Sequence, residues 1–170
     1  MSHEIEWIVT AHRPKAQGEI QVERHPALAK AEQGKRYAPL SKPVEVQVAD
    51  KTFRLDQSPY LLAIEGKKPV AALSIAMSDD DLLLLGYGGC AELSSAGVGD
   101  ALIEEAVRVA AETGRRRLIA PVTNADVLAL FFLQTKGFTV DAVRPYAGPA
   151  HTGAADIPAT HELVLVRPLG

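Results

Sequence analysis

The chain has 170 residues, of which 47% are hydrophobic and 23% charged, the balance of an ordinary soluble domain rather than a disordered chain. This length predicts one domain over residues 1–170. A net charge of −3 and a single cysteine, Cys90, argue against electrostatic nucleic-acid binding, an internal disulfide and a cysteine zinc site. No apolar run reaches the roughly 20 residues of a membrane helix, and no apolar leader follows Met1. We therefore expect a cytoplasmic protein with no metal and no nucleic-acid or membrane partner.

Extended segments dominate the first half of the chain. Val44, Val46 and Val48 alternate with polar residues, which is the period-2 pattern of a half-buried strand. A short helix is expected at residues 25–34, ended by Gly34. The other expected strands are residues 5–10, 60–64, 69–77 and 82–87. Polar turns at 65–68 and 78–81 join the last three of them into an antiparallel meander.

Helical periodicity marks the second half. Residues 98–111 predict an amphipathic helix that Gly114 ends. Its apolar positions are Val98, Leu102, Ala106, Val109 and Ala110, and its polar ones Glu104, Glu105, Arg108 and Glu112. A second helix is expected at 125–136, with Asn124 as N-cap and Gly137 as C-cap. Strands at 118–122, 138–143 and 162–166, with a long loop at 145–159, complete an α/β fold: a mixed sheet in which an antiparallel meander is followed by α-β-α-β-β.

The turn Gly97-Val98-Gly99 is the most informative local feature. Two glycines let the backbone curl closely around a ligand, and the first turn of the following helix adds unpaired N–H donors, so a phosphate or pyrophosphate fits there. The same residues could also form only a tight connection between strand and helix. A dinucleotide fold would need glycine in place of Leu102, and a mononucleotide P-loop would need Gly-Lys-Ser/Thr after the turn; neither is present.

Two blocks, separated by one helix and one strand, occur together. The first is the hexapeptide Ser94-Ser95-Ala96-Gly97-Val98-Gly99, and the second runs from Asn124 to Phe138. In these blocks the sequence resembles the GNAT N-acetyltransferase superfamily, with its Arg/Gln-x-x-Gly-x-Gly/Ala loop and its Asn-x-Asn-x-x-Ala-x-x-Phe-Tyr-x-x-x-Gly-Phe block. The resemblance covers about residues 44–169. It implies the GNAT fold and transfer of an acetyl group from acetyl-CoA to a primary amine of a small molecule or peptide, and it leaves a homodimer open.

The resemblance also implies where the cofactor binds. The backbone of residues 96–100 would hold the pyrophosphate, and a β-bulge near Gly86, Gly88 and Gly89 would receive the pantetheine, although these glycines could equally just twist the edge of a sheet. Cys90 lies beside them and could equally be a small core residue. The predicted cofactor-binding residues are Gly89, Cys90, Ala96, Gly97, Val98, Gly99, Asp100, Asn124, Phe132 and Leu133.

Four positions depart from the family pattern. Ser94 stands in place of the Arg/Gln and Ser95 in place of the glycine next to it. Asp126 stands in place of the second Asn, and Leu133 in place of the tyrosine that in the family protonates the CoA thiolate. Because leucine has no proton to donate, we predict Tyr146 as the replacement acid; His151 lies in the same loop. The departures leave two alternatives open: a degenerate, non-catalytic acyl-CoA-binding module, and a structural or partner-binding domain.

Overall fold

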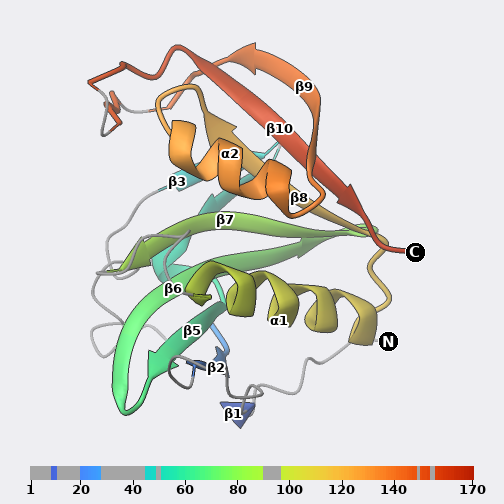
Figure 1. Cartoon of the computed structure of the whole chain (residues 1–170). Helices are drawn as coiled ribbons and strands as arrows, with labels where there is room; N and C mark the ends of the chain where they lie inside the picture. The colour runs from blue at the N-terminus through green and yellow to red at the C-terminus, as the bar shows by residue number, and fades with distance from the viewer. Residues whose placement is uncertain are drawn as a thin grey trace.

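A computed structural model describes residues 9–10, 20–27, 45–48, 51–89, 97–148, 150–153 and 156–170 (Figure 1). Its main sheet has eight strands in the order β1-β2-β5-β6-β7-β8-β10-β9. They are β1 (Val9–Thr10), β2 (Ile20–His25), β5 (Tyr60–Glu65), β6 (Lys68–Ser78), β7 (Asp81–Gly89), β8 (Arg117–Thr123), β10 (His161–Pro168) and β9 (Thr139–Pro145). The remaining elements are the hairpin β3 (Glu45–Val48) and β4 (Lys51–Arg54), the 3-10 helix η3 (Leu55–Gln57), and the helices α1 (Val98–Glu112) and α2 (Val127–Thr135).

The sheet is mixed, as the sequence predicts. β7 and β8 pair in parallel, whereas the other neighbours in the sheet pair antiparallel. A parallel pair needs a crossover, and α1 supplies it by carrying the chain from the end of β7 back to the start of β8. The predicted meander and the α-β-α-β-β order are therefore confirmed.

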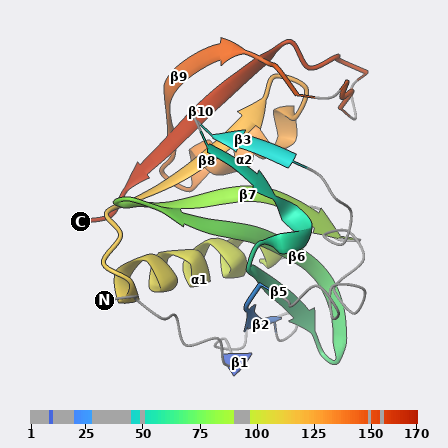
Figure 2. The same cartoon turned by 180° about the vertical axis from the view of Figure 1, so that it is seen from behind.

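The two faces of the sheet are covered differently. α1 and α2 lie on one face, and the β3–β4 hairpin lies on the other (Figures 1 and 2). The four consecutive leucines of β7 contribute to the packing on both faces, because successive strand residues point to opposite faces. Leu82 and Leu84 pack beneath the helices. Leu83 and Leu85 pack with the hairpin. Among the described residues, neither helix is long and apolar enough to cross a membrane.

The apolar face predicted for the first helix is buried along its whole length. Gly114 follows the helix with φ +70°, as expected of a C-cap. The polar face is predicted wrongly at one position, because Glu105 is fully buried. Arg24 of β2 donates from Nε to its carboxylate at 2.6 Å, and Arg108 donates to it at 2.7 Å. Helical periodicity has no means of revealing a partner 81 residues away.

Three further expectations need correction. The helix predicted from residue 25 does not begin there: His25 is the last residue of β2, and residues 26–27 are not helical. Residues 28–34 lie outside the described residues, as does most of the strand predicted at 5–10. α2 is capped by Asp126 rather than by Asn124, whose side chain is bonded to the start of β10. β2 and β4 were not predicted.

The buried cluster generates the first prediction. Replacing Glu105 with alanine leaves Arg24 buried beside an empty site, so the free energy of unfolding should fall by about 3–5 kcal/mol. Glu112→Ala is the matched control. Its carboxylate pairs with the same Arg24, which lowers the pKa of Glu112, but it is half exposed, and its loss should cost about 1 kcal/mol or less. Guanidinium unfolding measures both variants. Equal losses would contradict the assignment of the buried charge to Glu105.

Candidate active site

The site begins where two central strands separate. β7 and β8 pair only from Asp81–Arg117 to Leu83–Ile119. Beyond that point β7 continues to Gly89 and β8 to Thr123, and no further pairing joins these described residues. Figure 1 shows the two strands diverging from their paired end. A sheet opened in this way exposes polar backbone groups in the middle of the fold, where a ligand can bind them.

A β-bulge lies at the point of separation. On β6, Ile75 pairs with Leu84 and Ser74 pairs with Gly86, so Leu85 is an extra residue without a partner on β6. The bulge expected near Gly86 is therefore present. A Cβ at position 86 would lie 3.1 Å from Leu55 Cδ1, so glycine there lets η3 pack closely against the bulge.

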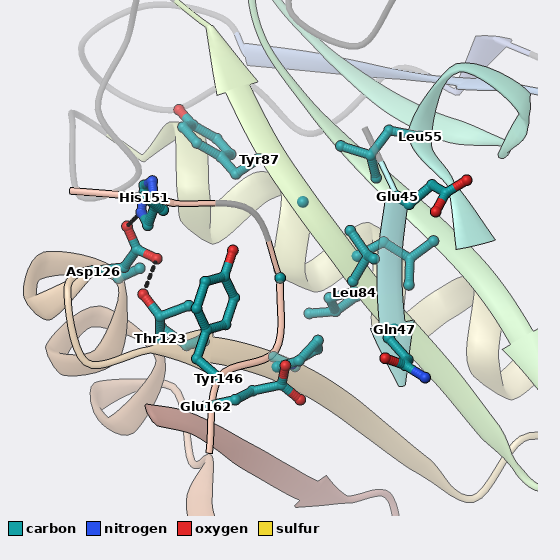
Figure 3. Close-up of a pocket in the computed structure, with 18 of the residues that line it drawn as sticks. Glu45, Gln47, Leu55, Leu84, Tyr87, Thr123, Asp126, Tyr146, His151 and Glu162 are labelled. Carbon is teal, nitrogen blue, oxygen red and sulfur yellow. Dashed lines mark hydrogen bonds and ion pairs between the residues drawn. The ribbon is translucent and has the colours of Figure 1, made fainter. Parts of the chain in front are cut away.

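A cavity of about 770 Å³ occupies the opening and reaches both faces of the sheet. The helix face contributes Ile103 from α1 and Ala129 and Leu133 from α2. The hairpin face contributes Glu45, Val46, Gln47, Thr52 and Leu55. Figure 3 shows Leu84, which lies next to the bulge on β7, among the lining residues. The volume falls within the range of about 300–1,000 Å³ usual for small-molecule sites.

One wall of the cavity is polar and hydrogen-bonded. His151 Nε2 lies 2.8 Å from Asp126 Oδ1, and Thr123 Oγ1 donates to Asp126 Oδ2 at 2.9 Å (Figure 3). Arg144 pairs with Glu162 through Nε at 3.0 Å. Because each of these acids has a partner, the wall carries ordered polar groups rather than an uncompensated cluster of negative charge.

Tyr146 projects into the same cavity from the segment between β9 and β10 (Figure 3). Burial raises the pKa of Tyr146 above its ordinary value, and the negative charges of Asp126 and Glu162 raise the pKa further. The side chain is therefore a phenol at neutral pH. A phenol donates a hydrogen bond and can donate a proton to a stronger base.

The segment that carries Tyr146 is docked on the start of α2. Asn124 Oδ1 accepts hydrogen bonds from the backbone N–H groups of Thr160 and His161 at 2.8 and 2.9 Å. The packing is closest at Gly153, where a Cβ would lie 1.9 Å from the carbonyl oxygen of Ala125. Only a residue without a side chain fits against that backbone.

At the other end of the opening, α1 begins in a left-handed glycine. Gly97 has φ +83°, and its carbonyl accepts the N–H of Ala101 at 2.9 Å. The N–H groups of residues 98–100 therefore lie in the first helical turn, where no intrahelical acceptor exists. The Asp100 carboxylate in this turn pairs with Lys136 Nζ, which also lies 5.4 Å from the centroid of the Phe132 ring.

The comparisons with known proteins agree with this geometry. No family model and no curated protein matches the sequence. Among solved structures, the IAA acetyltransferase from Bacillus cereus matches 89% of this chain and 100% of its own, with a TM-score of 0.66 at 15% identity. The chain has the GNAT fold. The ribosomal-protein-S18-alanine N-acetyltransferase from Escherichia coli matches 89% of this chain and 94% of its own, with a TM-score of 0.61 at 12% identity. A GNAT family acetyltransferase from Elizabethkingia anophelis with acetyl-CoA bound matches 66% and 76%, with a TM-score of 0.58 at 15% identity.

Of the predicted cofactor-binding residues, some lie at the start of α1 or in the cavity, some are packed elsewhere, and two lie outside the described residues. Gly97, Val98, Gly99 and Asp100 form the start of α1 as expected, and Leu133 lines the cavity. Phe132 is packed in the core beneath α2, and Asn124 contacts β10 rather than the cavity. Cys90 and Ala96 lie outside the described residues. The cofactor roles of all these residues stay predictions.

Gly89, the remaining predicted residue, ends β7 with φ +154°. A Cβ there would lie 2.5 Å from the carbonyl oxygen of Val70, so a close approach of β6 requires glycine at this position.

Sequence reasoning gave no role to several residues of the site, among them Lys136, which neutralises Asp100, and Thr123, which orients Asp126. The Lys136–Asp100 contact has no local signal, because it joins the end of α2 to the start of α1. Thr123 and Asp126 are three residues apart in one turn, and their Thr-x-x-Asp spacing could have indicated that contact. In the part of the chain that the structure describes, no group of three or more His, Cys, Asp or Glu side chains is arranged to hold a metal ion.

The close packing at Gly153 yields the second prediction. Gly153→Ala should separate the loop from α2, because the new Cβ cannot occupy the space of the Ala125 carbonyl. The amide protons of Thr160 and His161 should then exchange with solvent at least tenfold faster, as measured by hydrogen–deuterium exchange. Gly66→Ala, in the β5–β6 turn where a Cβ meets nothing within 4 Å, is the control and should leave those amides unchanged. Unchanged exchange in Gly153→Ala would contradict the docking.

Proposed function

We propose that the protein transfers an acetyl group from acetyl-CoA to a primary amine of a small molecule or peptide. The observation that carries the proposal is the cavity that passes through the sheet between β7 and β8. Because the cavity is lined from both faces, the donor would bind on the side of the helices and the acceptor on the side of the hairpin. The two substrates would then meet at the bulge.

The start of α1 supports acetyl-CoA as the donor. The first-turn N–H groups of residues 98–100 and the positive end of the helix dipole suit a pyrophosphate. Asp100 alone would repel a phosphate, but its ion pair with Lys136 removes that charge from the site. Acetyl-CoA is bound in the Elizabethkingia anophelis GNAT structure, which has the same fold.

The separated strand supports acyl transfer. Past Leu83, the backbone groups of β7 that face β8 have no strand partner there, so an N–H near Leu84–Gly86 can polarise a thioester carbonyl. A neutral amine held in line with that carbonyl attacks it directly, so most of the catalysis comes from positioning and from this polarisation.

The hairpin side supports an amine as the acceptor. Glu45, Gln47 and Thr52 line the cavity there, whereas Asp126 and Glu162, farther along its wall, are paired with His151 and Arg144. Carboxylates and neutral hydrogen-bond acceptors attract an ammonium group more than an anion. We further take residues 1–170 as a single domain that acts in the cytoplasm.

Leu133 favours a second candidate function. Leu133 lines the cavity, and the family resemblance implies a proton donor at this position, but a leucine side chain has no proton to donate. A protein that binds acyl-CoA without turning it over would tolerate this residue.

Thermal unfolding with and without acetyl-CoA, together with an assay of free thiol release, separates the candidates. At about 100 times its dissociation constant, a ligand of the native state adds roughly 2.7 kcal/mol. For a domain of this size Tm should rise by about 5–10 °C. Thiol release that depends on an added amine supports the transferase. A shift without release for any amine supports the binding module, and no shift contradicts both.

Gly97 gives a further prediction. Gly97→Ala strains a backbone with φ +83° and places a methyl group beside the proposed pyrophosphate, so acetyl-CoA affinity should fall at least tenfold. Gly114→Ala at the opposite end of α1 is the matched control, with φ +70° and nothing within 4 Å of the new Cβ. Both changes should cost about 1–2 kcal/mol of stability. Calorimetric titration that finds the two variants equally weakened would contradict a pyrophosphate site at Gly97.

A further inference from the structure

Two side chains that line the cavity bear on how a leaving thiolate would gain a proton. Leu133 of α2 is buried and apolar. Tyr146 also lines the cavity, and Figure 3 shows its hydroxyl directed toward β7, the strand that carries the bulge. The half-buried Tyr87 of β7 is a second tyrosine in the lining, whereas the Tyr146 hydroxyl is supplied by the segment after β9 and not by α2.

Three consecutive residues before α2 anchor that segment. Asn124 accepts the N–H groups of Thr160 and His161, and Nδ2 of Asn124 donates to the carbonyl of Pro158 at 3.2 Å. Gly153 packs against the backbone carbonyl of Ala125. The side chain of Asp126 is hydrogen-bonded to that of His151.

The chain around Tyr146 is held as well. Its own N–H donates to Thr160 O at 2.9 Å, so the anchored residue Thr160 fixes the backbone of the tyrosine directly. A Cβ at Gly148 would lie 2.5 Å from the Tyr146 hydroxyl, so the chain passes close beneath the ring.

We propose that Tyr146 protonates the departing CoA thiolate, and that the turn of residues 124–126 serves to position it. The proposal rests on the acetyl-transfer function proposed above. It gives Asn124 and Asp126 a role in holding the acid, in place of the contact with CoA that the family resemblance implies for this turn.

The reaction balances as follows. The amine nitrogen forms a bond to the thioester carbon, the carbon–sulfur bond breaks, and its electron pair stays on sulfur. The Tyr146 hydroxyl gives its proton to that sulfur, and CoA leaves as the thiol. The surplus proton of the new amide nitrogen passes to water, and the tyrosinate regains a proton from water after CoA has left.

The charges that surround Tyr146 keep it in the donor form. Asp126, at the start of α2, and Glu162, on β10, both raise the pKa of its hydroxyl, while Arg144 and His151 are engaged with these two acids. The tyrosine therefore remains protonated over the pH range in which most amines become neutral enough to attack.

Removing the hydroxyl tests the catalytic role. Tyr146→Phe keeps the ring and should lower kcat about 10²-fold or more, while the dissociation constant for CoA stays within twofold. Tyr60→Phe is the control: this tyrosine is buried between sheet residues and His25, outside the cavity, and kcat should not change. Gly148→Ala keeps the hydroxyl but displaces it, and should also lower kcat with CoA affinity unchanged.

Asn124 tests the positioning role. Asn124→Ala should lower kcat about tenfold, leave the KM for acetyl-CoA unchanged, and speed the exchange of the Thr160 and His161 amide protons. Asn124→Asp retains the accepting oxygen and should restore most of kcat and of the amide protection. A residue that bound CoA would instead raise the KM.

Each outcome decides one point. If the native protein transfers acetyl groups and Tyr146→Phe keeps its full kcat, Tyr146 is not the acid, and the transferase function stands. If Asn124→Ala weakens CoA binding at least tenfold, the turn serves CoA and the positioning role is wrong. If the native protein acetylates no amine at all, the proposed function fails and this proposal fails with it.

Discussion

The structure depends on one interrupted strand pairing. β7 and β8 hold three residue pairs and then part, with Leu85 as the extra residue of a bulge beside the break. A sheet that stays paired along its length has no room for a ligand between strands, since neighbouring strands lie about 4.8 Å apart. The cavity exists because the pairing stops, and the backbone groups released at that point are the ones a thioester carbonyl can use.

Opening a sheet in its middle removes hydrogen bonds, and packing on both faces compensates. α1 and α2 cover one face over a continuous apolar cluster, and the hairpin with η3 covers the other. The Arg24–Glu105 pair joins β2 to the centre of α1 beneath this cover. Each partner also has a more exposed second partner, Glu112 for Arg24 and Arg108 for Glu105, but the contact between the two buried groups is the one that holds the centre of α1 against β2. That placement also fixes where the first turn of α1 begins relative to the sheet.

Two of the segments that line the cavity are joined by one short turn. α2 and the segment between β9 and β10 both contribute lining residues, and the turn of residues 124–126 bonds to the second segment just before α2 begins. A short hydrogen-bonded contact of this kind can position a catalytic side chain on one segment. The lining residues of the other segment need not then be polar. In this chain α2 contributes the apolar Leu133 to the cavity, and the phenol of Tyr146 comes from the other segment.

The meander, both helices and the glycine turn could be predicted from the sequence, because each follows from local periodicity or from a backbone conformation that glycine favours, and the order of these elements indicated a mixed sheet. The period-2 and 3.6-residue patterns of β6, β7 and α1 arise within a few residues and need no distant partner. Tertiary structure alone decided which polar side chains meet. From the sequence, Glu105 is expected to face solvent on its helix, but in the structure it is bonded to Arg24 of β2. Asn124 is expected to cap a helix, but its side chain accepts the N–H groups of Thr160 and His161 instead. The point at which β7 separates from β8 likewise has no local signal. Pairing depends on both strands together, so the sequence of one strand does not show where it ends.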